Sequence, residues 1–176
     1  MSGTDAFLVR PAAQADAAAL ADIYNHYVLH TAVTFDLSAV AAAQRAEWIA
    51  AHPPTGRHRL LVAQREGRVI GYASSSRFNP KAAYDTSVET SIYVCPEATR
   101  GGVGTRLYEA LFAALAGEDV HRAYAGITLP NEASVALHHR FGFRPAGLYR
   151  EVGRKLGRYW DVQWFEKPLD GPAAEG

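Results

Sequence analysis

A run of glycines stands directly before a helical pattern in the segment RGGVGTRLYEALFAAL, residues 100–115. Glycine destabilises a helix by up to ~1 kcal/mol relative to alanine, so the run lowers helix stability at the point where a helix must start. Glycines also leave the N–H groups at a helix N-terminus open to an anion as large as a pyrophosphate. The segment therefore predicts a site for a phosphate-bearing ligand, with a plain flexible turn as the alternative.

Two common phosphate-binding motifs are absent from this segment. A P-loop needs Lys and then Ser or Thr after its last glycine, whereas Gly104 is followed by Thr105 and Arg106. The dinucleotide fingerprint G-x-G-x-x-G needs a third glycine where Leu107 stands. What remains is a strand, a proline, a glycine-rich turn and a helix N-terminus.

Groups able to transfer protons flank the glycine run. Glu89 opens the strand-like segment VETSIYVCP that leads into the run, so its carboxylate could act as a general base beside a ligand bound there. His138 and His139 follow in a helical segment, and adjacent helical residues point about 100° apart, so at most one of them faces a site. A solvated carboxylate and surface or capping histidines are the alternatives.

The elements that must position these groups alternate between strand and helix patterns. The segment FLVRP reads as a strand, and a helix with its apolar residues at helical spacing follows over residues 20–28. A second helix is expected over residues 38–52, with Ser38 as its N-cap, and residues 30–36 between the helices read as a loop. The remaining expected elements are a hairpin around REG, a strand ending at Pro96, a helix ending near Gly117, the strand RAYAGITL, the short helix NEASVALHHRFGF and two closing strands.

Composition limits the class of protein. A chain of 176 residues with 48% hydrophobic content suits one α/β domain, expected over residues 1–170 with a loose tail at 171–176. Eighteen basic and eighteen acidic residues cancel, which disfavours nucleic-acid and membrane partners. The single cysteine, Cys95, excludes an intramolecular disulfide and a cysteine-rich zinc site, and no metal is expected. With no signal-peptide pattern and no apolar run of about 20 residues, we expect a cytoplasmic protein.

The order of these elements resembles the GNAT superfamily of acetyl-CoA-dependent N-acetyltransferases. LVAQREGRVIGYA, IYVCPEATRGGVGTRLYEAL and NEASVALHHRFGF are similar to its successive core motifs. Within it, IYNHYV, AYDTSVETSIYV, LPNEAS and GRKLGRYWDV resemble the branch that acetylates phosphinothricin or methionine sulfoximine and sulfone. The resemblance covers residues 7 to 169 and implies the α/β GNAT fold with a mixed sheet, whose elements follow in the order strand, two helices, three strands, helix, strand, helix and two strands.

The resemblance implies acetyl-CoA as co-substrate, bound by the glycine turn. The first position of the superfamily's turn pattern falls on Thr99, where a long polar residue is usual, and Arg100 follows it. A main-chain N–H near Ile92 to Val94 is expected to stabilise the oxyanion where the strand ladder opens. The cofactor-binding residues implied are Ile92, Tyr93, Val94, Arg100, Gly101, Gly102, Val103, Gly104, Thr105 and Asn131, the last of which could instead be a helix cap.

The resemblance also implies roles in catalysis and in acceptor binding. Glu89 matches the family's base, acting through water, and His138 stands where most members have a tyrosine that protonates the leaving thiolate. The acceptor-binding positions are Phe35, Asn79, Lys81 and Tyr84. Asn79 replaces a residue that is often basic, which favours a neutral sulfone or sulfoximine side chain over phosphinothricin.

The expected activity is acetyl transfer to the amine of a small amino-acid analogue, by direct attack in a ternary complex. The alternatives are acetylation of a protein or peptide amine and a non-catalytic module that binds acetyl-CoA. The aromatic segment GRYWDVQWFE offers apolar surface that a small monomer rarely exposes, and the similar family is dimeric, so a homodimer is expected.

Overall fold

The computed structural model describes residues 6–169 and contains one seven-stranded mixed sheet with helices on both faces. Along the chain come β1 (Leu8–Pro11), α1 (Ala17–His30), α2 (Ala42–Ala50), β2 (Arg59–Arg65), β3 (Arg68–Arg77), β4 (Ser87–Val94), α3 (Val103–Leu115), β5 (Arg122–Leu129), α4 (Glu132–Arg140), β6 (Arg144–Lys155) and β7 (Arg158–Pro168). Three short 3-10 turns complete the list: η1 (Gln14–Asp16), η2 (Ala82–Tyr84) and η3 (Pro96–Ala98). The predicted α/β fold and element order are confirmed, and the predicted tail at 171–176 lies outside the described residues.

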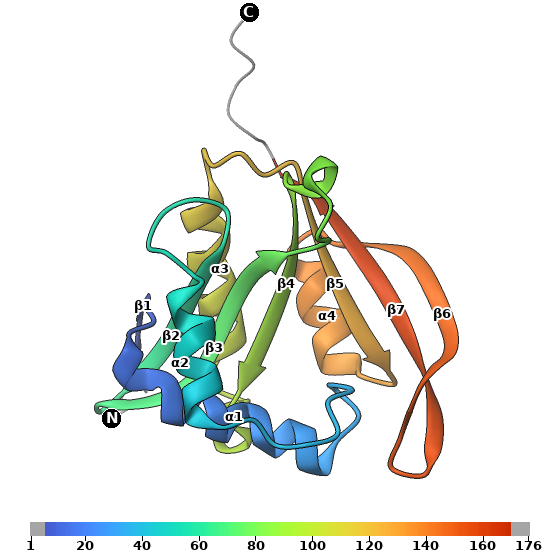
Figure 1. The fold of residues 1–176 in the computed structure, drawn as a ribbon, viewed down its shortest axis with the longest axis horizontal. Helices are drawn as coiled ribbons and strands as arrows, with labels where there is room; N and C mark the ends of the chain where they lie inside the picture. The colour runs from blue at the N-terminus through green and yellow to red at the C-terminus, as the bar shows by residue number, and fades with distance from the viewer. Residues whose placement is uncertain (1–5, 170–176) are drawn as a thin grey trace, which may run out of the picture.

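The sheet order is β1-β2-β3-β4-β5-β7-β6, and β4 with β5 is its parallel pair. In Figure 1, α1 and α2 lie in front of the sheet and α3 and α4 behind it. The core fills both sides of the central strands, with Val62, Leu107 and Leu111 fully enclosed. A continuous core on both faces is what holds the central strands rigid enough to position a site.

The ladder between β4 and β5 is short. It joins Ser87, Val88 and Glu89 to Arg122, Ala123 and Tyr124 and then stops, whereas β4 stays paired with β3 as far as Val94. Figure 1 shows the carboxyl ends of β4 and β5 diverging. This opening, predicted from the sequence, leaves the end of β4 without a ladder partner on its β5 side.

The start of the second helix differs from the prediction. The helix α2 begins at Ala42, not at Ser38, and Ala41 is its N-cap. Asn25 of α1 explains the shift, because its side chain donates to the Val40 carbonyl at 2.9 Å and accepts from the Val40 N–H at 2.8 Å. These bonds hold Val40 outside the helix, and the Gln44 side chain caps the Ala41 N–H instead, at 2.8 Å.

Candidate active site

The glycine turn forms one wall of the site. Gly102 is the N-cap of α3 and has a φ of 70°, a left-handed conformation that favours glycine. A Cβ at Gly102 would meet no atom within 4 Å, so open space lies over the turn. The turn therefore presents the N-terminus of α3 to a ligand.

A cleft of about 320 Å³ lies between the end of β4 and the starts of α3 and α4. Six residues named above share its lining with Asn131: Ile92, Tyr93, Val94, Gly102, Gly104 and Thr105. Arg100 and Gly101 are exposed on the turn beside it, and the Val103 side chain points into the core. Asn131 also caps α4, since its side-chain oxygen accepts from the Ser134 N–H at 3.2 Å. Asn131 can therefore both line the cleft and cap α4.

Glu89 lies where the β4–β5 ladder ends, and its side chain is half-buried. Burial raises the pKa of this carboxyl above its ordinary value, because water no longer solvates the charge fully. Within residues 6–169 the carboxylate makes no hydrogen bond or ion pair. An unpaired carboxylate with a raised pKa is well suited to accept a proton from a bound molecule.

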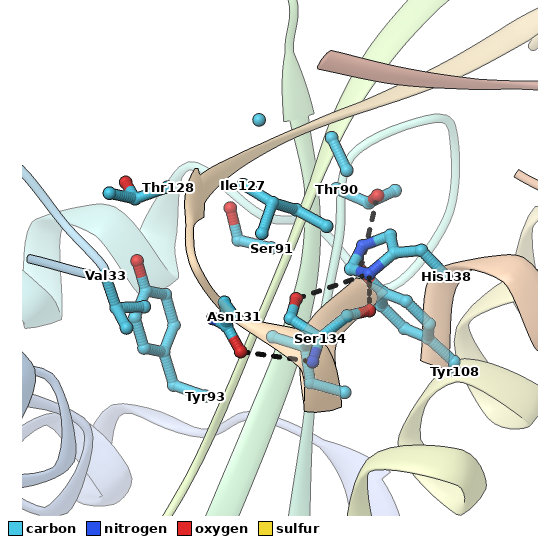
Figure 2. A pocket seen from close by; sticks show the side chains of 13 residues that line it. Val33, Thr90, Ser91, Tyr93, Tyr108, Ile127, Thr128, Asn131, Ser134 and His138 are labelled. Carbon is cyan, nitrogen blue, oxygen red and sulfur yellow. Dashed lines mark hydrogen bonds between the residues drawn. The ribbon is translucent and has the colours of Figure 1, made fainter. Parts of the chain in front are cut away.

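His138 is the histidine that faces the interior, with 3% of its surface exposed, whereas His139 is exposed. Its Nδ1 lies 2.7 Å from the Ser134 carbonyl oxygen, which can only accept, so Nδ1 carries the proton. Its Nε2 therefore accepts from the Tyr108 hydroxyl at 2.9 Å, as Figure 2 shows. Burial lowers the pKa of His138, so the ring stays neutral at physiological pH.

Tyr108 is not among the predicted site residues, yet its hydroxyl faces His138. Its ring is fully buried, yet it shares a small cavity of about 50 Å³ with His138, Ser91 and Tyr93. This cavity lies in the β4–β5 opening (Figure 2). No pattern in the sequence indicated that its hydroxyl faces His138.

A second cavity, of about 430 Å³, lies on the Glu89 side of the opening. Phe35, Tyr149, Val152 and Trp164 give it aromatic and apolar walls, and the Glu89 side chain lies among them. Phe35 packs so closely on Gly153 of β6 that a Cβ there would lie 2.1 Å from its ring. The loop carrying Phe35 is also fixed by Lys155, whose Nζ donates to the Thr34 carbonyl at 2.7 Å.

The other predicted acceptor residues lie outside this cavity. Lys81 is exposed, and Asn79 accepts from the Lys81 N–H at 3.0 Å within their own loop. Tyr84 is exposed, with its ring centroid 6.1 Å from that of Phe78. Phe78 in turn contacts Trp164 of the cavity wall at 6.0 Å between centroids. The structure thus brings Phe35 to Glu89 but leaves Asn79, Lys81 and Tyr84 at the margin.

The three cavities adjoin one another across the sheet, and together they are called the passage. The cleft and the small cavity share Ile92, Tyr93 and Asn131, and the small cavity shares Ser91 and Tyr93 with the Glu89 cavity. A phosphate-bearing ligand at the glycine turn can therefore reach through the opening toward Glu89. A passage that links the N-terminus of a helix to a half-buried carboxylate is suited to a group-transfer enzyme.

Comparison with known proteins agrees with this class. Residues 9–164 match the acetyltransferase (GNAT) domain, so the chain belongs to the GNAT family of acetyl-CoA-dependent N-acetyltransferases. It is 54% identical to a phosphinothricin N-acetyltransferase of Streptomyces coelicolor, over 96% of this chain and 100% of that protein. It is 36% identical to an L-methionine sulfoximine/L-methionine sulfone acetyltransferase of Salmonella typhimurium, over 94% of this chain and 96% of that protein.

A solved structure has the same fold. An acetyltransferase of Salmonella typhimurium determined with acetyl-CoA superposes with a TM-score of 0.88 at 35% identity, covering 97% of this chain and 98% of that one.

Two further findings concern a membrane span and a metal site. Among the described residues, no helix is long and apolar enough to cross a membrane. Across residues 6–169, no group of three His, Cys, Asp or Glu side chains could hold a metal ion.

Proposed function

We propose that the protein transfers the acetyl group of acetyl-CoA to the amine of a small amino-acid analogue of the phosphinothricin, methionine sulfoximine or methionine sulfone type. The observation that carries the proposal is the passage from the glycine-turn cleft to Glu89 through the β4–β5 opening. The names of relatives at 54% and 36% identity support the choice of acceptor.

The proposed reaction is direct attack within a ternary complex. Glu89, acting through water, takes a proton from the acceptor ammonium, because an α-ammonium with a pKa near ~8 is not a nucleophile. The neutral nitrogen attacks the thioester carbonyl carbon, and a main-chain N–H on the Ile92–Val94 segment stabilises the oxyanion. The attacking nitrogen then loses its second proton to solvent and the C–S bond breaks, giving the neutral amide and CoA thiolate. Cys95, the sole cysteine, is buried and lines none of the three cavities, which supports transfer without an acetyl-cysteine intermediate.

The proposal gives His138 a role on the thiolate side, exerted through Tyr108. A neutral His138 that accepts from Tyr108 fixes the direction of that hydroxyl, next to the part of the passage that Ile92 and Tyr93 line. The Tyr108 hydroxyl has a single hydrogen, which it donates to His138 in this arrangement, so it must turn that hydrogen away from His138 to protonate or solvate the leaving sulfur. Its pKa is raised by burial, so it remains a donor at physiological pH.

We also propose a cytoplasmic homodimer. Five large apolar side chains of the β6–β7 hairpin are exposed: Leu148, Tyr149, Val152, Leu156 and Tyr159. Tyr149 and Val152 also line the Glu89 cavity, so a partner covering this hairpin would complete the wall of the acceptor site.

The test is a thiol-release assay with acetyl-CoA and a panel of acceptors: methionine sulfone, methionine sulfoximine, phosphinothricin, common amino acids and a short peptide. We expect one of the first three to have the highest kcat/KM, because specificity is differential binding of the transition state. A peptide that leads by tenfold or more would make the protein a peptide acetyltransferase. Binding of acetyl-CoA without turnover of any acceptor would make it a binding module.

A further inference from the structure

Val33 and Tyr93 lie at the junction of the three cavities. Both line the cleft at the glycine turn, the small cavity and the Glu89 cavity. In Figure 2 they lie on one side of the small cavity, and Tyr108 and His138 lie on the other. An acyl group that reaches from the cleft toward Glu89 must therefore pass between these two pairs of side chains.

Tyr93 and the opposite wall are held in place by their neighbours. The Tyr93 ring lies 5.2, 5.3 and 5.4 Å, centroid to centroid, from the rings of three other tyrosines: Tyr24, Tyr27 and Tyr72. Across the small cavity, Tyr108 is fully buried and hydrogen-bonded to His138. Neither wall can move aside for a longer acyl chain without disturbing the packed core.

Val33 lies on the loop between α1 and α2, and hydrogen bonds fix this loop on both sides of it. The Val33 N–H donates to the Thr31 hydroxyl at 3.2 Å, and that hydroxyl donates to the Tyr27 carbonyl at 2.8 Å. On the other side, the Thr34 carbonyl accepts from the Lys155 Nζ at 2.7 Å. The backbone therefore holds the Val33 side chain, a stiff β-branched group, at a set place in the junction.

The small cavity has the size of an acetyl group. Its volume of about 50 Å³ corresponds to roughly three to five water-sized groups, at ~10–15 Å³ each. An acetyl group has three non-hydrogen atoms and fits. The two further carbons of a butyryl group must extend into the junction, against Val33 and into the space from which the acceptor amine approaches the carbonyl carbon.

We infer that Val33 is a specificity-determining residue for the acyl donor, because it limits the transferred group to a chain of two carbons. The inference rests on the function proposed above. The Val33 methyl groups, the Tyr93 ring and the rigid wall opposite leave no place for a longer chain beside the bound amine. An alanine at position 33 would remove two carbon atoms from the junction while the hydrogen bonds of the loop backbone remain.

The test compares acetyl-CoA with butyryl-CoA as donors, using kcat/KM with the preferred acceptor at saturation. For the wild type we expect acetyl to exceed butyryl by 100-fold or more, since one extra methylene in a closed pocket costs about 10- to 200-fold. Val33→Ala should reduce this ratio at least tenfold. Val33→Thr, which keeps the branched shape, and Leu37→Ala, at an exposed position of the same loop, are the matched controls and should keep the wild-type ratio.

An unchanged acetyl-to-butyryl ratio in a folded Val33→Ala protein, or equal rates of the wild type with both donors, would overturn the inference and leave the proposed acetyl transfer intact. If the wild type acetylates no acceptor, calorimetric titration of the two acyl-CoAs decides. At least tenfold tighter binding of acetyl-CoA, abolished by Val33→Ala, would support the limit on chain length although the transfer function fails. Equal affinities of that inactive wild type would contradict both.

Discussion

At the scale of the residue, Glu89, the proposed base, carries a cost in stability. Its folded-state pKa is raised, so it favours the folded state below its unfolded pKa, and that contribution is lost as pH rises through the folded pKa. At neutral pH the buried charge is therefore unfavourable. We expect Glu89→Gln to raise the melting temperature by about 1–4 °C at pH 7.5, and the gain to shrink below pH 5, as scanning calorimetry can measure. A variant that melts lower than wild type at neutral pH would show that the carboxylate is well compensated.

His138 is tested against its neighbour on the same helix. We expect His138→Ala to lower kcat by about tenfold, less than the loss of a general base, because water can reach an exposed thiolate. It should also flatten the acid limb of the pH profile, since protonation of His138 removes the acceptor for Tyr108. His139→Ala, at the exposed ring, is the control and should match wild type. Equal profiles for the two variants would leave His138 a structural residue.

At the scale of the element, a larger side chain at Gly104 tests whether the glycine turn and the start of α3 bind acetyl-CoA. A Cβ at Gly104 would meet Leu137 at 3.4 Å and Ile92 at 3.5 Å, ordinary contacts, so the fold should accept a small side chain. Gly104→Val adds an isopropyl group at the cleft and should weaken acetyl-CoA binding at least tenfold, which removes most of the thermal shift at a fixed ligand concentration. Gly147→Val, where a Cβ meets nothing within 4 Å, is the control. Undiminished binding by Gly104→Val would refute the assignment of the cleft.

The elements also show what could be predicted from the sequence. Alternation in VETSIYVCP, the glycine run and the helical spacing after it determine β4, the turn and α3, because these patterns are local. Ser38 was a plausible cap, yet Asn25, fifteen positions before Val40, bonds to the Val40 backbone and moves the start of α2. That start sets the register of Arg45 and Trp48 on the helix. The cavity of about 240 Å³ that Arg45, Trp48 and Glu89 line could therefore not be predicted, since it depends on contacts between segments far apart in the chain.

At the scale of the whole molecule, the exposed face of the β6–β7 hairpin predicts a dimer. We expect light scattering at micromolar concentration to give about twice the chain mass of 19.1 kDa. Leu148→Glu places a charge on this face and should shift the protein toward the monomer and raise KM for the acceptor. Leu8→Glu changes an equally apolar, exposed residue on β1, at the opposite edge of the sheet, and should leave the mass unchanged. A fully active wild-type monomer would contradict the dimer.

The most direct test of acetyl transfer with Glu89 as base is the rate of CoA release by Glu89→Gln with the preferred acceptor. We expect kcat at pH 7.5 to fall by about 100- to 10,000-fold, with acetyl-CoA affinity nearly unchanged, because the substitution keeps the side chain's size and removes only the base. Raising the pH should restore part of the rate, since more of the acceptor amine is then already neutral. A Glu89→Gln enzyme with wild-type kcat at neutral pH would contradict the mechanism and make Glu89 an ordinary strand carboxylate.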